Sequence, residues 1–402
     1  MNSHSPNSHS RKTIEIREVS DKRALNTFIQ IPWQIYKDDP NWVPPLLVEQ
    51  KQVFSSKNPF FKHAIWRAWI AYQDGKPVGR ISAQIDELHQ QRYQDKTGFF
   101  GLIEAPDDGE IFLALFETAE SWLRENGMRR ITGPYNLGIN QMIGILIDGF
   151  DSRPYVMTSH SARYYGAAIE SCGYQPVQDL LAYQLDAGTL NIPRIMRALI
   201  KRSAKRVKVR AFNRKMMNAE FELMRDIFND AWQNNWDFVA FTPEEFSELG
   251  KNLLKVVPDD FIQFAEIDGE AAAFIVLLPD INEVIADLNG RLLPFGWARL
   301  LWRLKVAFPK AARVPLMGVR QKYQNSSVGP AMAYMVIEAA INAGIEIGLE
   351  RVEMSWVLDH NKATRNIIES VGGEITKRYR MYEKDLYANE LYTEDLLAIN
   401  QV

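Results

Sequence analysis

A single carboxylate interrupts the apolar-rich segment RVEMSWVL in the C-terminal part of the chain. Side chains alternate along a strand, so Glu353 and Ser355 would lie on the same face of this segment. A carboxylate inside a central strand is costly unless it has a task or a partner. Glu353 is therefore a candidate general base, and the alternative is an ion pair with Arg351 or Arg380 at the end of a sheet.

Four other polar side chains are candidates for proton transfer or for contact with an acceptor substrate. Tyr379 and Tyr382 lie on the predicted last strand, where aromatic packing is the alternative to a role as general acid. Asp280 and Asn282 follow a predicted strand in the segment PDINEV, where turn formation is the alternative to contact with substrate.

An uncharged turn, YQNSSVG, separates the apolar segment VPLMGV from the run PAMAYMVIEAAINAG. This order predicts a strand, a turn and a long helix, so the turn would lie at a helix N-terminus. The free N–H groups and the positive dipole end of a helix suit a phosphate, and none of the side chains in the turn repels an anion. The predicted anion-binding residues are Gln324, Asn325, Ser326, Ser327, Val328 and Gly329.

Metal chemistry and several other mechanisms lack their residues in this sequence. The six histidines show no ligand-like spacing with one another or with the single cysteine, Cys172. There is no G-x-S-x-G elbow, Walker loop or dinucleotide-binding fingerprint. We therefore predict no metal site and no hydrolase, nucleotidase or dehydrogenase.

The composition is that of a globular protein with more than one core. At 402 residues the chain is longer than one core usually organises, so about two domains are expected. The formal net charge of -3 supplies no overall field for nucleic acid, which is not expected as a partner. The single cysteine and the absence of a signal-peptide pattern favour a cytoplasmic protein.

The two halves of the chain repeat one another. IAYQDGKPVGRISAQID (70–86) aligns without gaps over FAEIDGEAAAFIVLLPD (264–280), and both segments predict hairpins turned at Asp-Gly. AIESCGYQPVQDLLAYQLD (168–186) aligns over IIESVGGEITKRYRMYEKD (367–385), and the two share Ile-Glu-Ser-x-Gly and the pair Tyr183/Tyr382. Several matching blocks in the same order indicate a duplication.

Each half therefore predicts an α/β layer with a mixed, twisted sheet flanked by helices. In the first half we expect a strand at IEIREV, a helix from about Asp21, the hairpin, a strand at FFGLIEA, a long helix, a strand near Arg130, a helix near Tyr165 and closing strands. The second half repeats this order from RVKVRAF. The predicted boundaries are a disordered N-terminus at 1–12, domains at 13–187 and 206–387, a linker at 188–205 and a tail at 388–402.

A strand followed by Q/R-x-x-G-x-G/A and a helix resembles the acyl-CoA pyrophosphate loop of the GNAT N-acyltransferase superfamily, and QNSSVG fits with Ser327 in place of the first glycine. The segment DHNKATRNIIESVGG resembles the next GNAT motif, with Asn361 in the asparagine position. Ile368 stands where a tyrosine often protonates the leaving thiolate, so the general acid is unassigned. The resemblance implies two tandem GNAT-like domains, acyl-CoA as co-substrate, and a thioester carbonyl polarised by the backbone of Met317, Gly318 and Val319.

The first half provides an internal comparison for this loop. FFGLIEAPDDGEIF aligns without gaps over LMGVRQKYQNSSVG, which places Asp107, Asp108 and Glu110 opposite the uncharged turn. Three carboxylates suit helix capping but repel a pyrophosphate, and Phe112 replaces the final glycine. We therefore expect acyl-CoA in the second half, with the first half a degenerate GNAT-like domain that shapes an acceptor cleft.

A narrower resemblance rests on PNWVPPL with NPFF, the long segment GPYNLGINQMIGILIDGFDSRPYVM and the ending KRYRMYEKDL. These segments resemble a bacterial GNAT-like family that includes bacterial ceramide synthases, which implies acylation of a sphingoid amine from acyl-CoA. Long ordered insertions often line sites. We therefore expect Asn136, Asn140, Tyr164 and Tyr165 to face an interdomain cleft, with helix packing as the alternative for the tyrosines.

Two basic segments favour an amphiphilic acceptor. Residues 290–313 interleave Trp, Leu and Phe with Arg and Lys, which is typical of a membrane-surface helix, and a lid or core helix is the alternative. Residues 201–215 carry eight basic side chains, which suit either a charged linker or attraction to CoA phosphates and anionic lipid. Peripheral contact with the inner face of the cell membrane is therefore expected.

Three functions are compatible with these features. The first is an acyl-CoA-dependent N-acyltransferase that acts on a primary amine, in particular a long-chain or sphingoid amine. The second is an aminoacyl-tRNA-dependent tandem-GNAT transferase, which RNA dependence would distinguish. The third is a non-catalytic acyl-CoA or lipid-binding protein, an alternative that Ser327 and Ile368 leave open.

Overall fold

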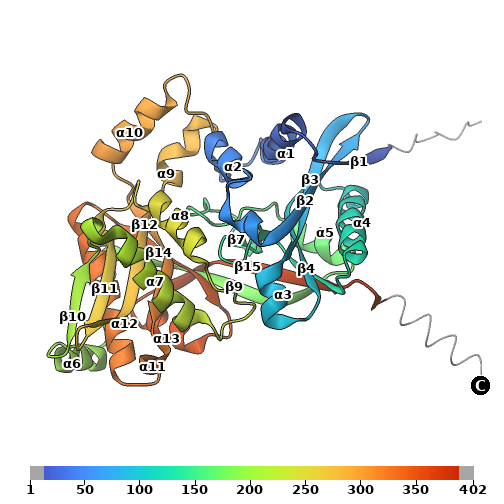
Figure 1. Ribbon diagram of the computed structural model, residues 1–402. Helices are drawn as coiled ribbons and strands as arrows, with labels where there is room; N and C mark the ends of the chain where they lie inside the picture. The colour runs from blue at the N-terminus through green and yellow to red at the C-terminus, as the bar shows by residue number, and fades with distance from the viewer. Residues whose placement is uncertain (1–12, 389–402) are drawn as a thin grey trace, which may run out of the picture.

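The computed structural model describes residues 13–388. The predicted disordered N-terminus at 1–12, and all of the predicted tail except residue 388, lie outside the described residues. Within the described part, one 13-stranded sheet passes through the molecule and helices pack against both of its halves (Figure 1). The expected mixed α/β architecture of two similar halves is confirmed.

The strand order of the sheet joins the two halves edge to edge. Across the sheet the strands are β1 (Ile14–Glu18), β2 (Ala64–Gln73), β3 (Lys76–Asp86), β4 (Thr97–Glu104), β5 (Arg130–Gly133), β15 (Glu374–Asp385), β9 (Gln175–Asp186), β14 (Arg351–Leu358), β13 (Ala311–Val319), β12 (Glu270–Pro279), β11 (Ile262–Ile267) and β10 (Val207–Ala211). Strand β8 (Ile145–Asp148) also pairs with β15, and β6 (Tyr135–Asn136) forms a separate ribbon with β7 (Met142–Ile143).

The expected elements of the first half are present. Helix α1 (Lys22–Ile35) begins where the Asp21 side chain accepts a hydrogen bond from the Ala24 N–H, and α4 (Gly109–Glu125) begins at the matching cap, Asp108. Both predicted hairpins turn at Asp-Gly, with positive φ at each residue of the turn (52° and 77°, then 51° and 88°). The remaining helices of this half are α2 (Leu47–Val53), α3 (Glu87–Tyr93) and α5 (Tyr165–Ser171).

The second half has the same plan with more helices. They are α6 (Arg194–Ser203), α7 (Met217–Trp232), α8 (Pro243–Leu253), α9 (Asn282–Ile285), α10 (Gly296–Val306), α11 (Gln321–Gln324), α12 (Val328–Glu346) and α13 (Lys362–Ser370). Helix α12 is long and apolar enough to cross a membrane, but 56% of its apolar window is buried and it packs on β11, β12 and α6. It is the core helix of this half. The predicted linker at 188–205 contains α6.

The last strand of each half lies beside the fifth strand of the other half. β15 pairs with β5 of the first half, and β9 pairs with β14 of the second half. The two repeated tyrosines bond across the halves in the same way. The Tyr183 hydroxyl of the first half donates to Glu369 of the second (2.7 Å), and the Tyr382 hydroxyl of the second half donates to Glu170 of the first (3.3 Å). Each tyrosine thus binds the Ile-Glu-Ser motif of the opposite half. The predicted boundaries at 13–187 and 206–387 stay a prediction about the sequence repeat, since the sheet itself is continuous.

Candidate functional site

The sheet opens in the second half between β13 and β14. These parallel strands pair only from Ala311/Arg351 to Val314/Met354, although β13 continues to Val319 and β14 to Leu358. An interdomain cavity lies at this opening and holds about 870 Å³ of space, solvent at its mouth included. Both halves contribute to its lining: Ile139, Asn140, Gln141, Ile143, Met157, Leu180, Phe228, Trp232, Asn235, Trp236, Phe238, Phe241, Leu249, Leu253, Arg313, Pro315, Leu316, Trp356 and Leu358.

The cavity wall is mainly apolar. Among the described residues that line it, Arg313 alone is charged. Helices α7 and α8 and the loop between them supply aromatic and leucine side chains, and the first half supplies residues 139–143. Burial of an alkyl chain against such a lining is favourable because it removes apolar surface from water. Burial of a highly charged metabolite there is unfavourable. The space is therefore suited to the hydrocarbon part of a substrate.

The backbone of β13 points two amides toward the opening. The Arg320 N–H donates to the Ala272 carbonyl across the β12 pairing, and hydrogen bonding alternates along an antiparallel pair. Gly318 therefore faces β12, whereas the amides of Met317 and Val319 face away from it. In agreement, the carbonyls of these two residues accept hydrogen bonds from Trp232 Nε1 (2.8 Å) and Gln324 Nε2 (2.8 Å). Of the three predicted carbonyl-polarising residues, Met317 and Val319 have this orientation.

The predicted anion-binding turn is partly helical. Gln324 ends α11, and its amide folds back onto Val319. Asn325, Ser326 and Ser327 are exposed before α12, and Ser327 occupies the N-cap position without a capping side-chain bond. Ser326 Oγ accepts weakly from the N–H groups of Val328 and Gly329, both at 3.3 Å. The helix end is thus accessible and uncharged, as a phosphate would require.

The packing of the turn requires a glycine at position 329, which the sequence alone did not indicate. A Cβ at this position would lie 2.2 Å from the Tyr323 carbonyl oxygen, so any side chain would displace the backbone of α11. The glycine is therefore required for packing of the turn, whether or not a ligand approaches.

The first half fills the corresponding opening with its own chain. β4 and β5 pair only from Thr97 to Phe99, and Asn136 Oδ1 then accepts from the Leu102 N–H (2.9 Å). Gln84 donates to the carbonyl oxygen of Tyr135 (2.8 Å), which lies 1.9 Å from where a Cβ of Gly101 would stand. Residues 134–137 therefore fill the opening between β4 and β5.

Glu353 lies beside the cavity but does not line it. Its side chain is fully buried, and Ser355 Oγ donates to Glu353 Oε1 (2.6 Å) while accepting from Arg313 Nε (2.8 Å). Burial raises the pKa of Glu353, and the charge of Arg313, 3.8 Å away, opposes that shift. The sequence alternatives Arg351 and Arg380 pair elsewhere, with Glu283 and Asp179.

Tyr379 belongs with Glu353, whereas Tyr382 does not. Tyr379 is fully buried, and its hydroxyl makes no well-formed hydrogen bond among residues 13–388. Burial and the charge of Glu353 raise its pKa, and the neighbouring Thr158 hydroxyl and the charge of Arg313 oppose that shift. Tyr382 lies in the hydrophobic core of the first half, bonded to Glu170. Because they are three residues apart on β15, the two side chains lie on opposite faces of the sheet and pack in different clusters.

Asp280 and Asn282 hold a first-half segment against the site. Asp280 Oδ1 accepts from the Val156 N–H (2.9 Å), and Asn282 Nδ2 donates to the Pro154 carbonyl (2.9 Å). Burial raises the pKa of Asp280 to about 7 despite these backbone hydrogen bonds. Arg313 donates to the Met157 carbonyl of the same segment (2.9 Å). Asp280 and Asn282 thus lie where the halves meet, outside the cavity lining.

The remaining predicted site residues divide between the two halves. Asn140 lines the cavity and donates to the Val239 carbonyl across the interface (2.9 Å). The Tyr164 hydroxyl donates to the Ala105 carbonyl, just after β4, and the Tyr165 hydroxyl donates to Glu104 at the end of β4 (2.7 Å each). Both tyrosines therefore pack within the first half, as Asn136 does. Asn361 caps α13 by accepting from the Thr364 N–H (3.1 Å).

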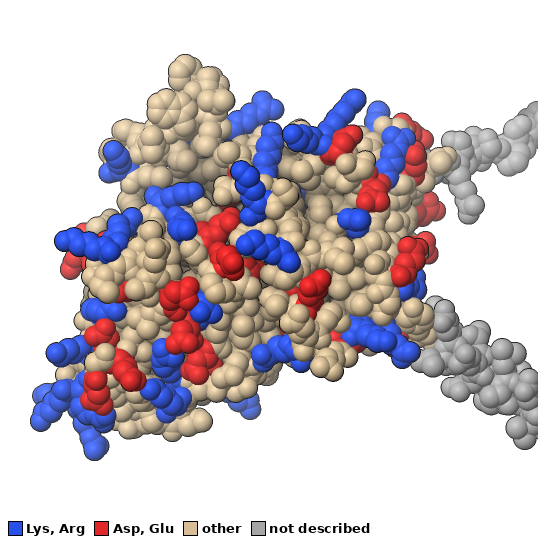
Figure 2. Space-filling model, viewed as in Figure 1, with Lys and Arg blue, Asp and Glu red and all other residues tan. Residues whose placement is uncertain are grey.

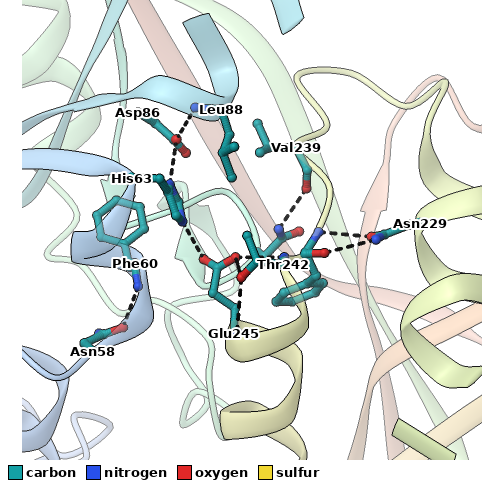
Figure 3. A network of polar contacts seen from close by, with 11 residues as sticks. Asn58, Phe60, His63, Asp86, Leu88, Asn229, Val239, Thr242 and Glu245 are labelled. Carbon is teal, nitrogen blue, oxygen red and sulfur yellow. Dashed lines mark hydrogen bonds and ion pairs between the residues drawn. The ribbon is translucent and has the colours of Figure 1, made fainter. Parts of the chain in front are cut away.

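A charged histidine fixes α8, one wall of the cavity, to the first half (Figure 3). His63 Nδ1 lies 2.9 Å from Asp86 Oδ1, and His63 Nε2 lies 3.1 Å from Glu245 Oε1 in the first turn of α8. Glu245 also closes a capping box with Thr242. Burial lowers the pKa of His63, but the hydrogen bonds to the two carboxylates outweigh burial and raise it to about 10.

Sequence reasoning missed the aromatic lining and Arg313. The segment NNWDFVAF carries three aromatic residues of the α7–α8 region, and this density in a polar stretch was an available signal. Arg313 had no local signal, because its importance comes from burial beside Glu353 and Trp356.

Residues 13–388 contain no group of three His, Cys, Asp or Glu side chains placed to hold a metal ion.

Two curated proteins are similar to the chain over nearly its whole length. It is 48% identical over 371 residues to protein YghO of Escherichia coli K12, which covers 92% of this chain and 95% of that one. It is 43% identical over 376 residues to the bacterial ceramide synthase of Caulobacter vibrioides, covering 93% and 98%. The chain belongs to the family of this ceramide synthase. No family model matches it.

Solved structures of GNAT proteins share the fold of this chain. A tandem GNAT protein from the clavulanic acid biosynthesis pathway superposes with a TM-score of 0.54 at 11% identity, over 93% of this chain and 99% of that one. A GCN5-related glucosamine N-acetyltransferase region of a fungal multi-domain protein gives 0.56 at 14% identity, over 94% of this chain and 38% of that chain. The predicted GNAT relationship is therefore confirmed for the fold.

Proposed function

We propose that the protein is an acyl-CoA-dependent N-acyltransferase whose acceptor is a long-chain primary amine of the sphingoid type. The observation that carries the proposal is the apolar cavity at the open end of β13 and β14, built jointly by both halves. The name of the Caulobacter vibrioides relative supports the same substrate class.

Acyl-CoA is proposed to bind along the second half only. Its pyrophosphate would lie at the accessible start of α12, around Asn325 to Gly329, and its pantetheine arm would enter between β13 and β14. The thioester oxygen would accept hydrogen bonds from the β13 amides of Met317 or Val319. The first half is excluded from this role by residues 134–137 and by the carboxylate cap at Asp108.

The reaction forms a C–N bond and breaks the C–S bond of the thioester. The neutral amine attacks the carbonyl carbon, the amine nitrogen loses one proton, and CoA leaves as the thiol after taking up a proton. We propose Glu353 as the proton acceptor, through the Ser355 hydroxyl that already donates to it. Tyr379 is the proposed donor to the leaving thiolate, since its hydroxyl is uncommitted among the described residues.

The experiment measures free thiol released from long-chain acyl-CoA in the presence of a long-chain amine. Ser327→Glu adds a carboxylate at the N-cap of α12, and Ser327→Gln is its neutral control of equal size. Because a carboxylate stabilises a helix N-terminus, Ser327→Glu should keep or raise the melting temperature while its acyl-CoA affinity falls about tenfold or more relative to Ser327→Gln.

Three outcomes would contradict parts of the proposal. Equal affinity of the two Ser327 variants would remove the pyrophosphate assignment. Tight acyl-CoA binding without thiol release from any amine would favour a non-catalytic binding protein. Transfer that requires aminoacyl-tRNA would favour the RNA-dependent alternative.

A further inference from the structure

Helix α10 and the loop before it form an apolar projection that nothing in the described chain covers. Figure 1 shows α10 standing away from the sheet at the upper left, and the tip of the same projection is uncharged in Figure 2. Fourteen large apolar side chains are exposed among residues 13–388, and six of them lie between 293 and 306. They are Leu293, Phe295, Trp297, Leu301, Trp302 and Val306.

The base of the projection is firmly held. The Leu300 and Leu304 side chains pack on a small core that contains Val284, Ile285 and Leu288. The Leu47 N–H donates to the Gly290 carbonyl (2.9 Å), which ties the base to the first half. The exposed apolar side chains are therefore displayed on a supported helix, so their exposure does not come from a frayed segment.

The charge on the projection has one sign. Residues 291–310 contain five basic and no acidic side chains. Asp287, just before this segment, pairs with Arg299 and Arg303, whereas Arg291 and Lys305 form no ion pair within residues 13–388. A supported helix that exposes Trp, Leu and Val side chains with basic groups among them matches the interface of an anionic bilayer.

We propose that residues 291–310 dock the protein on an anionic membrane surface, with α10 lying in the interface. This inference concerns a surface separate from the acyl-transfer site and goes beyond the proposed reaction. The projection continues into α9 and Asp280, which hold the first-half segment beside the cavity. Docking would therefore bring the cavity close to the bilayer in which a long-chain amphiphile dissolves.

The test is co-sedimentation of the full-length protein with vesicles that contain no amine acceptor and no acyl-CoA. One vesicle set is phosphatidylcholine alone, and the other is an equal mixture of phosphatidylcholine and phosphatidylglycerol. The wild type should bind the anionic vesicles more tightly, and binding should weaken as salt is raised. Because no substrate is present, the result does not depend on the proposed reaction.

Variants identify the surface. The triple variant Trp297→Ser/Leu301→Ser/Trp302→Ser should lower the partition coefficient on anionic vesicles about tenfold or more, because less apolar surface would be buried in the bilayer. Arg291→Gln/Lys305→Gln should reduce the preference for anionic over neutral vesicles. The control Ile195→Ser/Met216→Ser removes exposed apolar groups elsewhere and should leave binding unchanged. All five positions of the two apolar sets are exposed, so melting temperatures should stay within a few degrees of the wild type.

The proposal would be overturned if the wild type failed to bind anionic vesicles, or if the triple variant bound as well as the wild type. It would also be overturned if the triple substitution converted a dimer to a monomer in analytical ultracentrifugation without lowering vesicle binding. That result would assign the surface to a second copy of the chain.

Discussion

At the scale of single residues, Tyr379 and Tyr382 differ although both are buried on β15. Tyr382 donates to Glu170 inside the first-half core, while the Tyr379 hydroxyl faces the Glu353 cluster without a partner among residues 13–388. Tyr183, the repeat counterpart of Tyr382, makes the equivalent bond to Glu369. Contacts thus distinguish residues that sequence position had grouped.

We expect Tyr382→Phe to lower the free energy of unfolding by about 1 kcal/mol through loss of one hydrogen bond, with kcat unchanged. Tyr183→Phe is its matched control and should behave alike. Tyr379→Phe should keep the stability and reduce kcat, about tenfold or more, if the hydroxyl protonates the thiolate. Chemical denaturation and thiol-release rates measure both quantities, and a loss of kcat in Tyr382→Phe alone would reverse the assignment.

Glu353 combines a structural and a proposed catalytic role, and two substitutions separate them. Glu353→Gln leaves the Arg313 charge buried without its counter-charge, which should cost about 3 kcal/mol. Adding Arg313→Met should recover much of that stability. Activity should remain at least about a hundredfold below wild type in both proteins if Glu353 accepts the amine proton.

The pH dependence of kcat provides the second readout for Glu353. In the wild type, kcat should fall as the carboxyl becomes protonated at low pH, whereas the double variant should lack this acidic limb. A double variant that regained both stability and wild-type kcat would show that the cluster is structural only.

At the scale of elements, α8 depends on a proton held by His63. The folded-state pKa of His63 is about 10, above the ordinary histidine value of 6.5, so the stabilisation is fully present below about pH 6.5 and is lost as pH rises through 10. At pH 6 the free energy of unfolding of the wild type should exceed that of His63→Gln by on the order of a few kcal/mol, since each unit of pKa shift corresponds to about 1.4 kcal/mol.

Urea unfolding of wild type and His63→Gln between pH 6 and pH 10 measures this difference. The advantage of the wild type should shrink steadily across that range. A difference that stayed constant, or grew with pH, would contradict a protonated His63 between Asp86 and Glu245.

Helix α8 also lines the cavity, through Leu249 and Leu253. Leu249→Trp adds an indole to a lining position, so it should lower kcat/KM for a long-chain amine by about tenfold or more and leave a short-chain amine nearly unaffected. Leu249→Met, which conserves volume, is the control. An equal loss for both amines in Leu249→Trp would indicate that the cavity does not hold the acceptor chain.

At the scale of the whole molecule, the exchange of β9 and β15 makes one cooperative unit from two repeats. Residues 206–402 alone would lack β9 beside β14, and residues 1–187 would lack β15 beside β5. We expect each fragment to be unfolded by circular dichroism and the full chain to melt in a single transition. A fragment with a native-like melting transition would contradict this view.

Local pattern predicted much of the fold, because Asp-Gly turns, helix caps and the repeat are encoded within a few residues of one another. The partners of β9 and β15 could not be predicted, since a strand pattern specifies the faces of a strand and not its neighbour. Tyr382 lies outside the predicted site because alternation along β15 places it on the opposite face of the sheet from Tyr379. The loop before α12 was located correctly in the chain, whereas Arg313 and the cavity wall arise only from packing between halves.

In the proposed function, the interdomain cavity receives a long-chain amine for acylation by acyl-CoA. Its most direct test is mass spectrometry of the lipid extract after incubation with long-chain acyl-CoA and equal amounts of a sphingoid amine and a short-chain primary amine. We expect the N-acyl sphingoid amide as the dominant product, formed in step with free thiol and reduced in Leu249→Trp. Exclusive acylation of the short-chain amine, or thiol release without any amide, would contradict it.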